Sequence, residues 1–159
     1  MLKKIFSAVL ALSIMLVSSV AMAGYYNDYY PRYFNDDRNY ILCGGFQGVA
    51  IYAIRNSVNV EEYNPPNYTI AIDVGYANIQ RGDTTIIRKE TRRFVYNWET
   101  KEVFYVGNKY LRPIYPNENQ FWKGVRLNGL EGLAEITFCI AYNQKFWGTY
   151  PEEFYDFMN

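Results

Sequence analysis

Alternation of apolar and polar residues is the strongest structural signal along the chain. Between residues 68 and 76, large or branched side chains occupy every second position, and small or polar residues stand between them. A period of two is typical of a β-strand with one buried face. The positions on the predicted buried face are Tyr68, Ile70, Ile72, Val74 and Tyr76.

Five further segments predict the other strands of the same sheet. They are short apolar or alternating runs, separated by glycine, proline or asparagine, which favour turns. The last two flank a short polar connection and form a hairpin candidate. The five segments cover residues 40–43, 49–54, 57–63, 84–98 and 102–106.

Residues 107–128 do not fit the strand pattern. They contain repeated glycine, proline and asparagine. We expect an irregular excursion there, with Phe121 and Trp122 packed back onto the core.

Residues 129–147 fit two patterns. As a strand, alternate residues in the second half of the segment are apolar. As a helix, the segment has apolar or small residues that recur at helical spacing from Leu130 onwards. Asn128 can cap the start of this helix, and Gly148 can end it. The length and the caps favour the helix, and a short last helix follows Pro151. The predicted fold is α+β: an antiparallel β-sheet meander of about five or six strands with a C-terminal helix packed on one face.

The N-terminus has the organisation of a secretory signal peptide. Two lysines precede an apolar run that ends near residue 20, and Ala-Met-Ala at residues 21–23 provides a cleavage pattern. The alternative is an uncleaved anchor, because the run nearly reaches the roughly 20 residues of a membrane span. We predict a signal peptide at residues 1–23, a tyrosine-rich lead-in segment at 24–39 and a single globular domain at 40–159. The expected location is secreted or periplasmic, with no stable membrane span after cleavage.

Charge and residue types narrow the function. Without residues 1–23 the chain has 136 residues and a net charge of −2, so electrostatics gives no reason to expect a nucleic-acid partner. Histidine is absent, which removes Ser-His-Asp and Cys-His catalysis and His-containing zinc sites. We expect no metal and no cofactor. Cys43 and Cys139 are expected to form a disulfide in an oxidising compartment, and two buried free thiols are the alternative.

Adjacent carboxylates are the remaining catalytic candidates. Acidic pairs stand at residues 36–37, 61–62 and 152–153. Two carboxylates can perform glycoside hydrolysis, but pairs in polar surroundings are usually solvated. We therefore expect no enzyme, with a carboxylate-based hydrolase as a remote alternative.

Two groups of residues indicate binding. Residues 24–40 contain six tyrosines among asparagine, aspartate and arginine, a composition typical either of adaptable recognition surfaces or of a spacer. In the basic run 88–93, Arg88 and Arg92 would share a strand face with aromatic residues, where arginine can bind acidic peptide or glycan groups. The alternative is an edge strand guarded by charge against aggregation. The candidate binding residues are Tyr25, Tyr26, Tyr29, Tyr30, Tyr33, Phe34, Arg88, Arg92 and Arg93.

Two aromatic strand motifs carry a resemblance to known proteins. With Tyr-Ala-Ile-Arg-Asn-Ser-Val at 52–58 and Phe-Val-Tyr-Asn-Trp at 94–98, residues 40–147 resemble small exported bacterial proteins of uncharacterised function, and also the bacterial surface-adhesin protein E domain. The resemblance implies a cell-envelope domain that binds other proteins and catalyses no reaction. A lipid-anchored adhesin has a cysteine after its signal peptide, where this chain has Gly24.

These observations together predict a non-catalytic secreted or periplasmic binding domain with a protein or glycan partner. A structural envelope protein that self-associates is the alternative.

Overall fold

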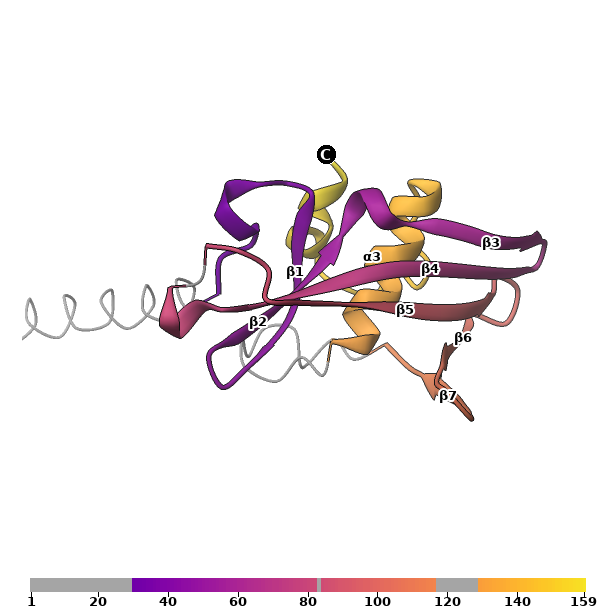
Figure 1. Cartoon of the computed structure of the whole chain (residues 1–159). Helices are drawn as coiled ribbons and strands as arrows, with labels where there is room; N and C mark the ends of the chain where they lie inside the picture. Colours follow the sequence, from indigo (N-terminus) through magenta and orange to yellow (C-terminus); the bar gives the residue numbers. More distant parts are fainter. Residues whose placement is uncertain (1–29, 83, 117–128) are drawn as a thin grey trace, which may run out of the picture. The chain divides into compact units, whose positions relative to one another are not determined.

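The predicted α+β class is confirmed by a computed structural model, which describes residues 30–82, 84–116 and 129–159 (Figure 1). Residues 31–159 form one compact unit. In these residues the sheet is antiparallel and contains seven strands, where the sequence predicted about five or six. The strands are β1 (Tyr40–Phe46), β2 (Val49–Ile54), β3 (Asn59–Asn64), β4 (Asn67–Asn78), β5 (Arg88–Asn97), β6 (Glu102–Val106) and β7 (Leu111–Ile114).

The long strand β4 organises the sheet. The order is β1-β2-β4-β5-β6-β7, and β3 pairs with β4 outside this path. On one side of β4, residues 67–71 pair with β3 and residues 74–78 pair with β2. On the other side, β5 pairs with β4 from Asn67 to Tyr76. The alternation seen in residues 68–76 therefore marks the centre of the sheet.

The first turn lies at residues 47–48, whereas Gly44 and Gly45, which were expected to separate the first two strands, belong to β1. Gln47 and Gly48 connect β1 to β2 with φ angles of 48° and 82°, the left-handed conformations that a two-residue hairpin turn requires. A register shift between Leu42 and Gly44 marks a bulge in β1. The β5–β6 hairpin forms as predicted, with Lys101 at a φ of 58° in its turn.

The prediction of an irregular excursion was wrong for residues 111–114. These residues form β7, which pairs with β6 along its whole length. Pro113 lacks the N–H that a central strand needs, but an edge strand tolerates proline because only one side must pair. Phe121 and Trp122, for which we predicted core packing, lie outside the described residues.

A helix, α3 (Leu130–Tyr142), follows β7 in the described part of the chain, so the helical interpretation of residues 129–147 is confirmed. Its ends differ from the prediction. Gly129 and Asn143 flank it, both in the left-handed conformation, and Gly148 lies beyond its end. Asparagine tolerates that conformation at a helix C-terminus almost as glycine does. Asn128 lies outside the described residues.

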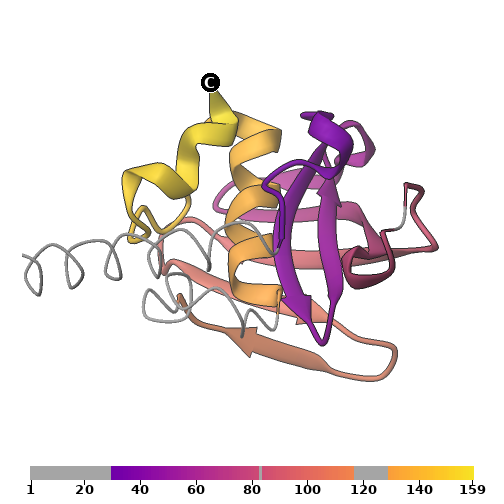
Figure 2. The same ribbon diagram turned by 90° about the vertical axis from the view of Figure 1, so that its left-hand side faces the viewer.

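The main core lies between α3 and one face of the sheet. Ile70, Ile72 and Val74 of β4 are almost fully buried there, and Leu133 and Ile136 of α3 belong to the same cluster. The C-terminal 3-10 helix η4 (Glu152–Met158) lies on the same side as α3 (Figure 2) and adds the buried side chains Phe154, Tyr155 and Phe157.

Helix η4 makes side-chain to backbone contacts with two arginines that are distant in the sequence. Arg32 Nη2 donates a hydrogen bond to the carbonyl of Phe154 over 3.0 Å, across a sequence separation of 122 residues. Arg55 Nη2 contacts the carbonyl of Phe157 across 102 residues. In this way two backbone carbonyls of η4 accept contacts from arginine side chains near the start of the domain.

Residues 31–39 are laid against the domain. The Leu42 amide donates to the carbonyl of Arg32 over 2.8 Å, and Tyr33 forms a β-bridge with Ile41. A short 3-10 helix, η1 (Phe34–Asp36), inserts Phe34 against Tyr52, with ring centroids 5.4 Å apart. The described end of the tyrosine-rich lead-in segment thus contributes to packing.

The predicted disulfide is not formed. Cys43 and Cys139 are both free and buried, which was the alternative that the sequence left open. Cys43 Sγ lies 3.3 Å from the carbonyl oxygen of Ile51 and donates to it within the β1–β2 hairpin. Burial raises the pKa of Cys43 to about 12 and also raises the pKa of Cys139. Each thiol is packed as a small apolar group in the core.

Among the described residues, no helix is both long and apolar enough to cross a membrane. The predicted signal peptide at residues 1–23 lies outside this part of the chain.

Candidate functional site

The pairing of β4 with β5 decides which arginines meet. Arg88 lies opposite Tyr76, and Arg92 lies opposite Ile72. Residues directly opposite each other in an antiparallel pair share a face, so both arginines project on the face that α3 covers. Arg93 projects on the other face, where its Nη2 lies 2.6 Å from Glu61 Oε1. The structure therefore brings Arg88 and Arg92 together and separates Arg93 from them.

Strand β5 is an edge strand along only part of its length, among the described residues. β6 pairs with β5 from Phe94 to Asn97, so in the described chain residues 88–93 pair only with β4. This part of β5 has the open side that the edge-strand interpretation expected, and its charges fit that role too.

Arg92 is held in place by two tyrosines. Its Nη1 donates to Tyr105 Oη over 2.6 Å, and its Nη2 donates to Tyr76 Oη over 3.2 Å and contacts the carboxylate of Glu90. Its side chain is 27% exposed. Burial by itself lowers the pKa of Arg92, but the hydrogen bonds to the tyrosines and the charge of Glu90 raise it by more. The guanidinium is therefore charged and fixed in orientation.

Tyr76 links the two arginines. The guanidinium carbon of Arg88 lies 3.8 Å from the centroid of the Tyr76 ring, a cation–π contact. The Tyr76 hydroxyl contacts both Glu90 and Arg92. Burial, and next the contact with Glu90, raise the pKa of Tyr76, so the hydroxyl remains protonated. Two arginines and one glutamate leave a net positive charge on this part of the sheet.

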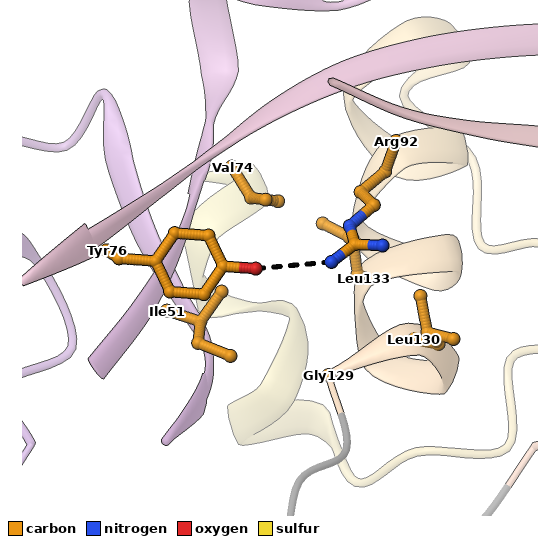
Figure 3. A pocket seen from close by; sticks show the side chains of 7 residues that line it. All are labelled: Ile51, Val74, Tyr76, Arg92, Gly129, Leu130 and Leu133. Atoms are coloured by element: carbon orange, nitrogen blue, oxygen red, sulfur yellow. Dashed lines mark hydrogen bonds between the residues drawn. The ribbon is translucent and has the colours of Figure 1, made fainter. Parts of the chain in front are cut away.

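Arg92 and Tyr76 line a hollow of about 140 Å³ at the start of α3 (Figure 3). The strands supply Ile51, Val74, Tyr76 and Arg92, and the start of the helix supplies Gly129, Leu130 and Leu133. The N-cap residue of α3 is Gly129, which has no side chain to cap the first turn, and the first amides of a helix lack intrahelical partners. We call this hollow the Arg92 pocket. Its positive charge and N–H donors suit a small anionic group such as a carboxylate.

A second hollow, of about 270 Å³, lies at the other end of α3. We call it the aromatic cleft. It has no charged side chain in its lining. The lining residues are Tyr63, Tyr68, Trp98, Phe138, Tyr142 and Gln144.

The sequence did not indicate the aromatic cleft. Tyr68 and Trp98 were recognised only as strand residues. The cleft exists because β3, β4, the end of β5 and the end of α3 meet, and this meeting is a property of the tertiary fold.

The tyrosine-rich candidates separate into three groups. Tyr25, Tyr26 and Tyr29 lie outside the described residues. Tyr30 and Tyr33 are partly buried, and the guanidinium carbon of Arg38 lies 5.6 Å from the Tyr33 ring centroid. Phe34 is 5% exposed and belongs to the core, so it is a structural residue and not an open contact.

The acidic pairs proposed for hydrolysis lie at the surface. Lys145 Nζ lies 2.7 Å from Glu152 Oε1, Glu61 is paired with Arg93, and Asp36 and Asp37 are exposed. In the residues that the structure describes, no three His, Cys, Asp or Glu side chains gather as a metal site would require.

Comparisons were made with protein-family models, with curated proteins and with solved structures. No match was found in any of them.

Proposed function

We propose that this protein is a non-catalytic binding domain, secreted or periplasmic, that recognises a protein or glycan through an acidic group bound in the Arg92 pocket. The observation that carries the proposal is the half-buried, tyrosine-held guanidinium of Arg92 at the wall of a hollow. The proposed location rests on the N-terminal pattern of residues 1–23.

The Arg92 guanidinium can bind a ligand carboxylate in addition to its contacts within the protein. Arginine carries five N–H donors in a planar fork that matches a carboxylate. Within the described part of the chain, contacts with Tyr105, Tyr76 and Glu90 occupy Nη1 and Nη2. A ligand carboxylate can replace or share the contact with Glu90, while both tyrosines hold the guanidinium in place.

The fixed orientation of the Arg92 side chain before a ligand arrives should increase its affinity for that ligand. An exposed arginine loses side-chain freedom when it binds, at a cost of about 0.5–1.5 kcal/mol. Arg92 has already lost much of that freedom through its two tyrosine contacts. Arg88, stacked on Tyr76, adds positive charge that attracts an acidic ligand.

The test is an NMR titration of the purified protein with matched probes. Glucuronic acid and an acetylated Asp-Glu dipeptide amide carry carboxylates. Their uncharged counterparts are glucose and an acetylated Asn-Gln dipeptide amide. We expect the acidic probes alone to shift the signals of Arg92 and Tyr76, and added salt to weaken binding.

The matched variants are Arg92→Gln and Arg93→Gln. We expect Arg92→Gln to weaken binding by at least tenfold and Arg93→Gln to leave it unchanged. Equal shifts with charged and uncharged probes, or undiminished binding by a folded Arg92→Gln protein, would remove the basis of the proposal.

Self-association is the second candidate, favoured by the edge strand β7. Leu111 within it and its neighbours Tyr110 and Tyr115 are exposed apolar side chains. Edge strands with exposed apolar residues can pair with another copy. Sedimentation across a concentration series tests this: an increase in mass that Leu111→Lys abolishes supports self-association, and a constant monomer mass excludes it.

A further inference from the structure

We propose that the aromatic cleft is a second binding site, which takes an uncharged saccharide. It shares no lining residue with the Arg92 pocket, so it does not depend on the function proposed above. The argument rests on the arrangement of its rings, its polar groups and its lack of charge.

Three tyrosines form one wall of the cleft. Tyr63 of β3 lies opposite Tyr68 of β4 in the strand register. Their ring centroids are 5.6 Å apart, and the ring of Tyr142 lies 5.3 Å from Tyr68 and 6.3 Å from Tyr63. These separations are typical of aromatic packing, so each ring supports the other two.

Tyr63 is the exposed member of this group. Its residue is 68% exposed, although its ring contacts both other tyrosines. By contrast, Trp98 stacks on Phe138 with an interplanar angle of 14°, and Lys101 Nζ lies 3.0 Å from the Trp98 ring centroid. Trp98 therefore supports the cleft, and Tyr63 offers an aromatic surface to a ligand. The C–H face of a sugar ring stacks on such a surface.

The polar groups of the cleft suit sugar hydroxyls. Tyr142 Oη is buried and has no hydrogen-bond partner among the described residues. Burial, then the neighbouring Tyr68 and Tyr63, raise the pKa of Tyr142, so the hydroxyl is available as a donor. Because this oxygen is buried, a ligand can reach it only after a neighbouring ring, such as that of Tyr63, moves. Gln144 adds an amide that both donates and accepts.

The lack of charge in the lining selects against ionic ligands. A proline-rich peptide is the main competitor, because aromatic grooves also bind polyproline helices. Proline has no N–H, so such a peptide cannot donate a backbone hydrogen bond from proline to the carbonyl oxygen of Gln144 or to a tyrosine oxygen. Sugar hydroxyls both donate and accept, as the cleft requires. At about 270 Å³, the space lies at the small end of ligand sites, which indicates recognition of one or two sugar units.

The experiment measures binding of neutral saccharides to the purified protein by saturation-transfer NMR and calorimetry. The probes are glucose, galactose, N-acetylglucosamine, maltotriose and chitotriose, with acetylated hexaproline amide as the competing class. We expect at least one saccharide to bind, and we expect its binding to exceed that of hexaproline.

Matched variants assign the binding to the cleft. Tyr63→Ala removes the exposed ring and should weaken saccharide binding at least tenfold, and Tyr142→Phe removes one hydroxyl and should weaken it several-fold. Tyr110→Ala removes another exposed tyrosine, outside the cleft, and should change nothing. Arg92→Gln should also leave saccharide binding intact, which separates this site from the Arg92 pocket.

Three results would overturn the proposal. They are the absence of binding by every saccharide at millimolar concentration, unchanged binding by folded Tyr63→Ala, and tighter binding of hexaproline than of any sugar.

Discussion

Glu135 provides a stringent test of how the C-terminal part of the domain is held. This glutamate of α3 is fully buried. Its carboxylate accepts hydrogen bonds from the Trp147 amide at 3.0 Å, the Gly148 amide at 3.3 Å and the Tyr155 hydroxyl at 2.9 Å. No cation forms an ion pair with it among the described residues. It therefore fastens the chain after α3 through hydrogen bonds alone.

The expected loss for Glu135→Ala follows from two opposed terms. Hydrogen bonds to a charged group contribute about 1.5–3 kcal/mol each, so three of them amount to about 5–9 kcal/mol. Removing the carboxylate also relieves its burial cost, which is several kcal/mol. We expect a net loss of about 3–5 kcal/mol, a large part of the roughly 5–15 kcal/mol that stabilises a domain.

The free energy of unfolding is to be measured by urea titration followed by far-UV circular dichroism. Tryptophan fluorescence is unsuitable here because Trp147 is one of the donors. Glu135→Gln keeps the shape and one accepting oxygen, so we expect a loss of about 1–3 kcal/mol. The control is Glu153→Ala, an exposed carboxylate, which should change stability by less than about 0.5 kcal/mol.

Hydrogen exchange adds a local measurement. In Glu135→Ala, the amides of Trp147 and Gly148 should lose protection before the strands do. If Glu135→Ala unfolds within about 1 kcal/mol of the original chain, or if Glu135→Gln is the more stable protein, the carboxylate does not hold this segment and the reasoning is wrong.

Three other measurements test separate features. In the folded protein, Cys43 and Cys139 should resist iodoacetamide at pH 8, because burial raises the pKa of both thiols. After unfolding without reductant, both cysteines should be labelled. If they stayed unlabelled in the unfolded chain, the disulfide prediction would be correct after all. Gly48→Ala should cost about 1–2 kcal/mol, since φ is +82° and the new Cβ would lie 2.7 Å from a glutamine oxygen. The hydrogen bond with Arg93 lowers the pKa of Glu61 below 4.5 in the folded state. As pH falls below that value, Glu61 becomes protonated and the ion pair is lost, so the difference in unfolding free energy between Arg93→Gln and the original chain should shrink. A difference that grows at low pH would contradict the pairing.

The central strand and the helix were predictable because their local patterns agree with their tertiary roles. The alternation from Tyr68 to Tyr76 matches a strand with α3 on one face. Residues 111–114 gave no such signal, because Leu-Arg-Pro-Ile does not alternate and contains a proline. That segment becomes a strand only because β6 offers it an edge.

The cysteine prediction failed for a geometric reason. An even count makes a disulfide plausible, but bond formation requires particular distances and directions of the two Cβ atoms. One cysteine lies in the β1 hairpin and the other in α3. Sequence alone contains no information on whether their thiols face each other.

The candidate sites were predictable to different degrees. Strand parity placed Arg88 and Arg92 on one face, but the choice of Tyr76 as their partner depends on the β4–β5 register. Glu135 was missed because a charged residue within a helix is usually solvated, and its hydrogen-bond donors come from the returning C-terminal segment, which sequence does not place beside it.

The contacts of Arg32 and Arg55 with the C-terminal helix η4 have a consequence for how the chain acquires its structure. They join residues 122 and 102 positions apart, and such contacts form only after long loops have closed. If the chain is exported as its N-terminus predicts, it crosses the membrane before these contacts can exist. The domain then completes its native core only after its last residues have arrived, and until that moment its aromatic residues depend on protection from aggregation.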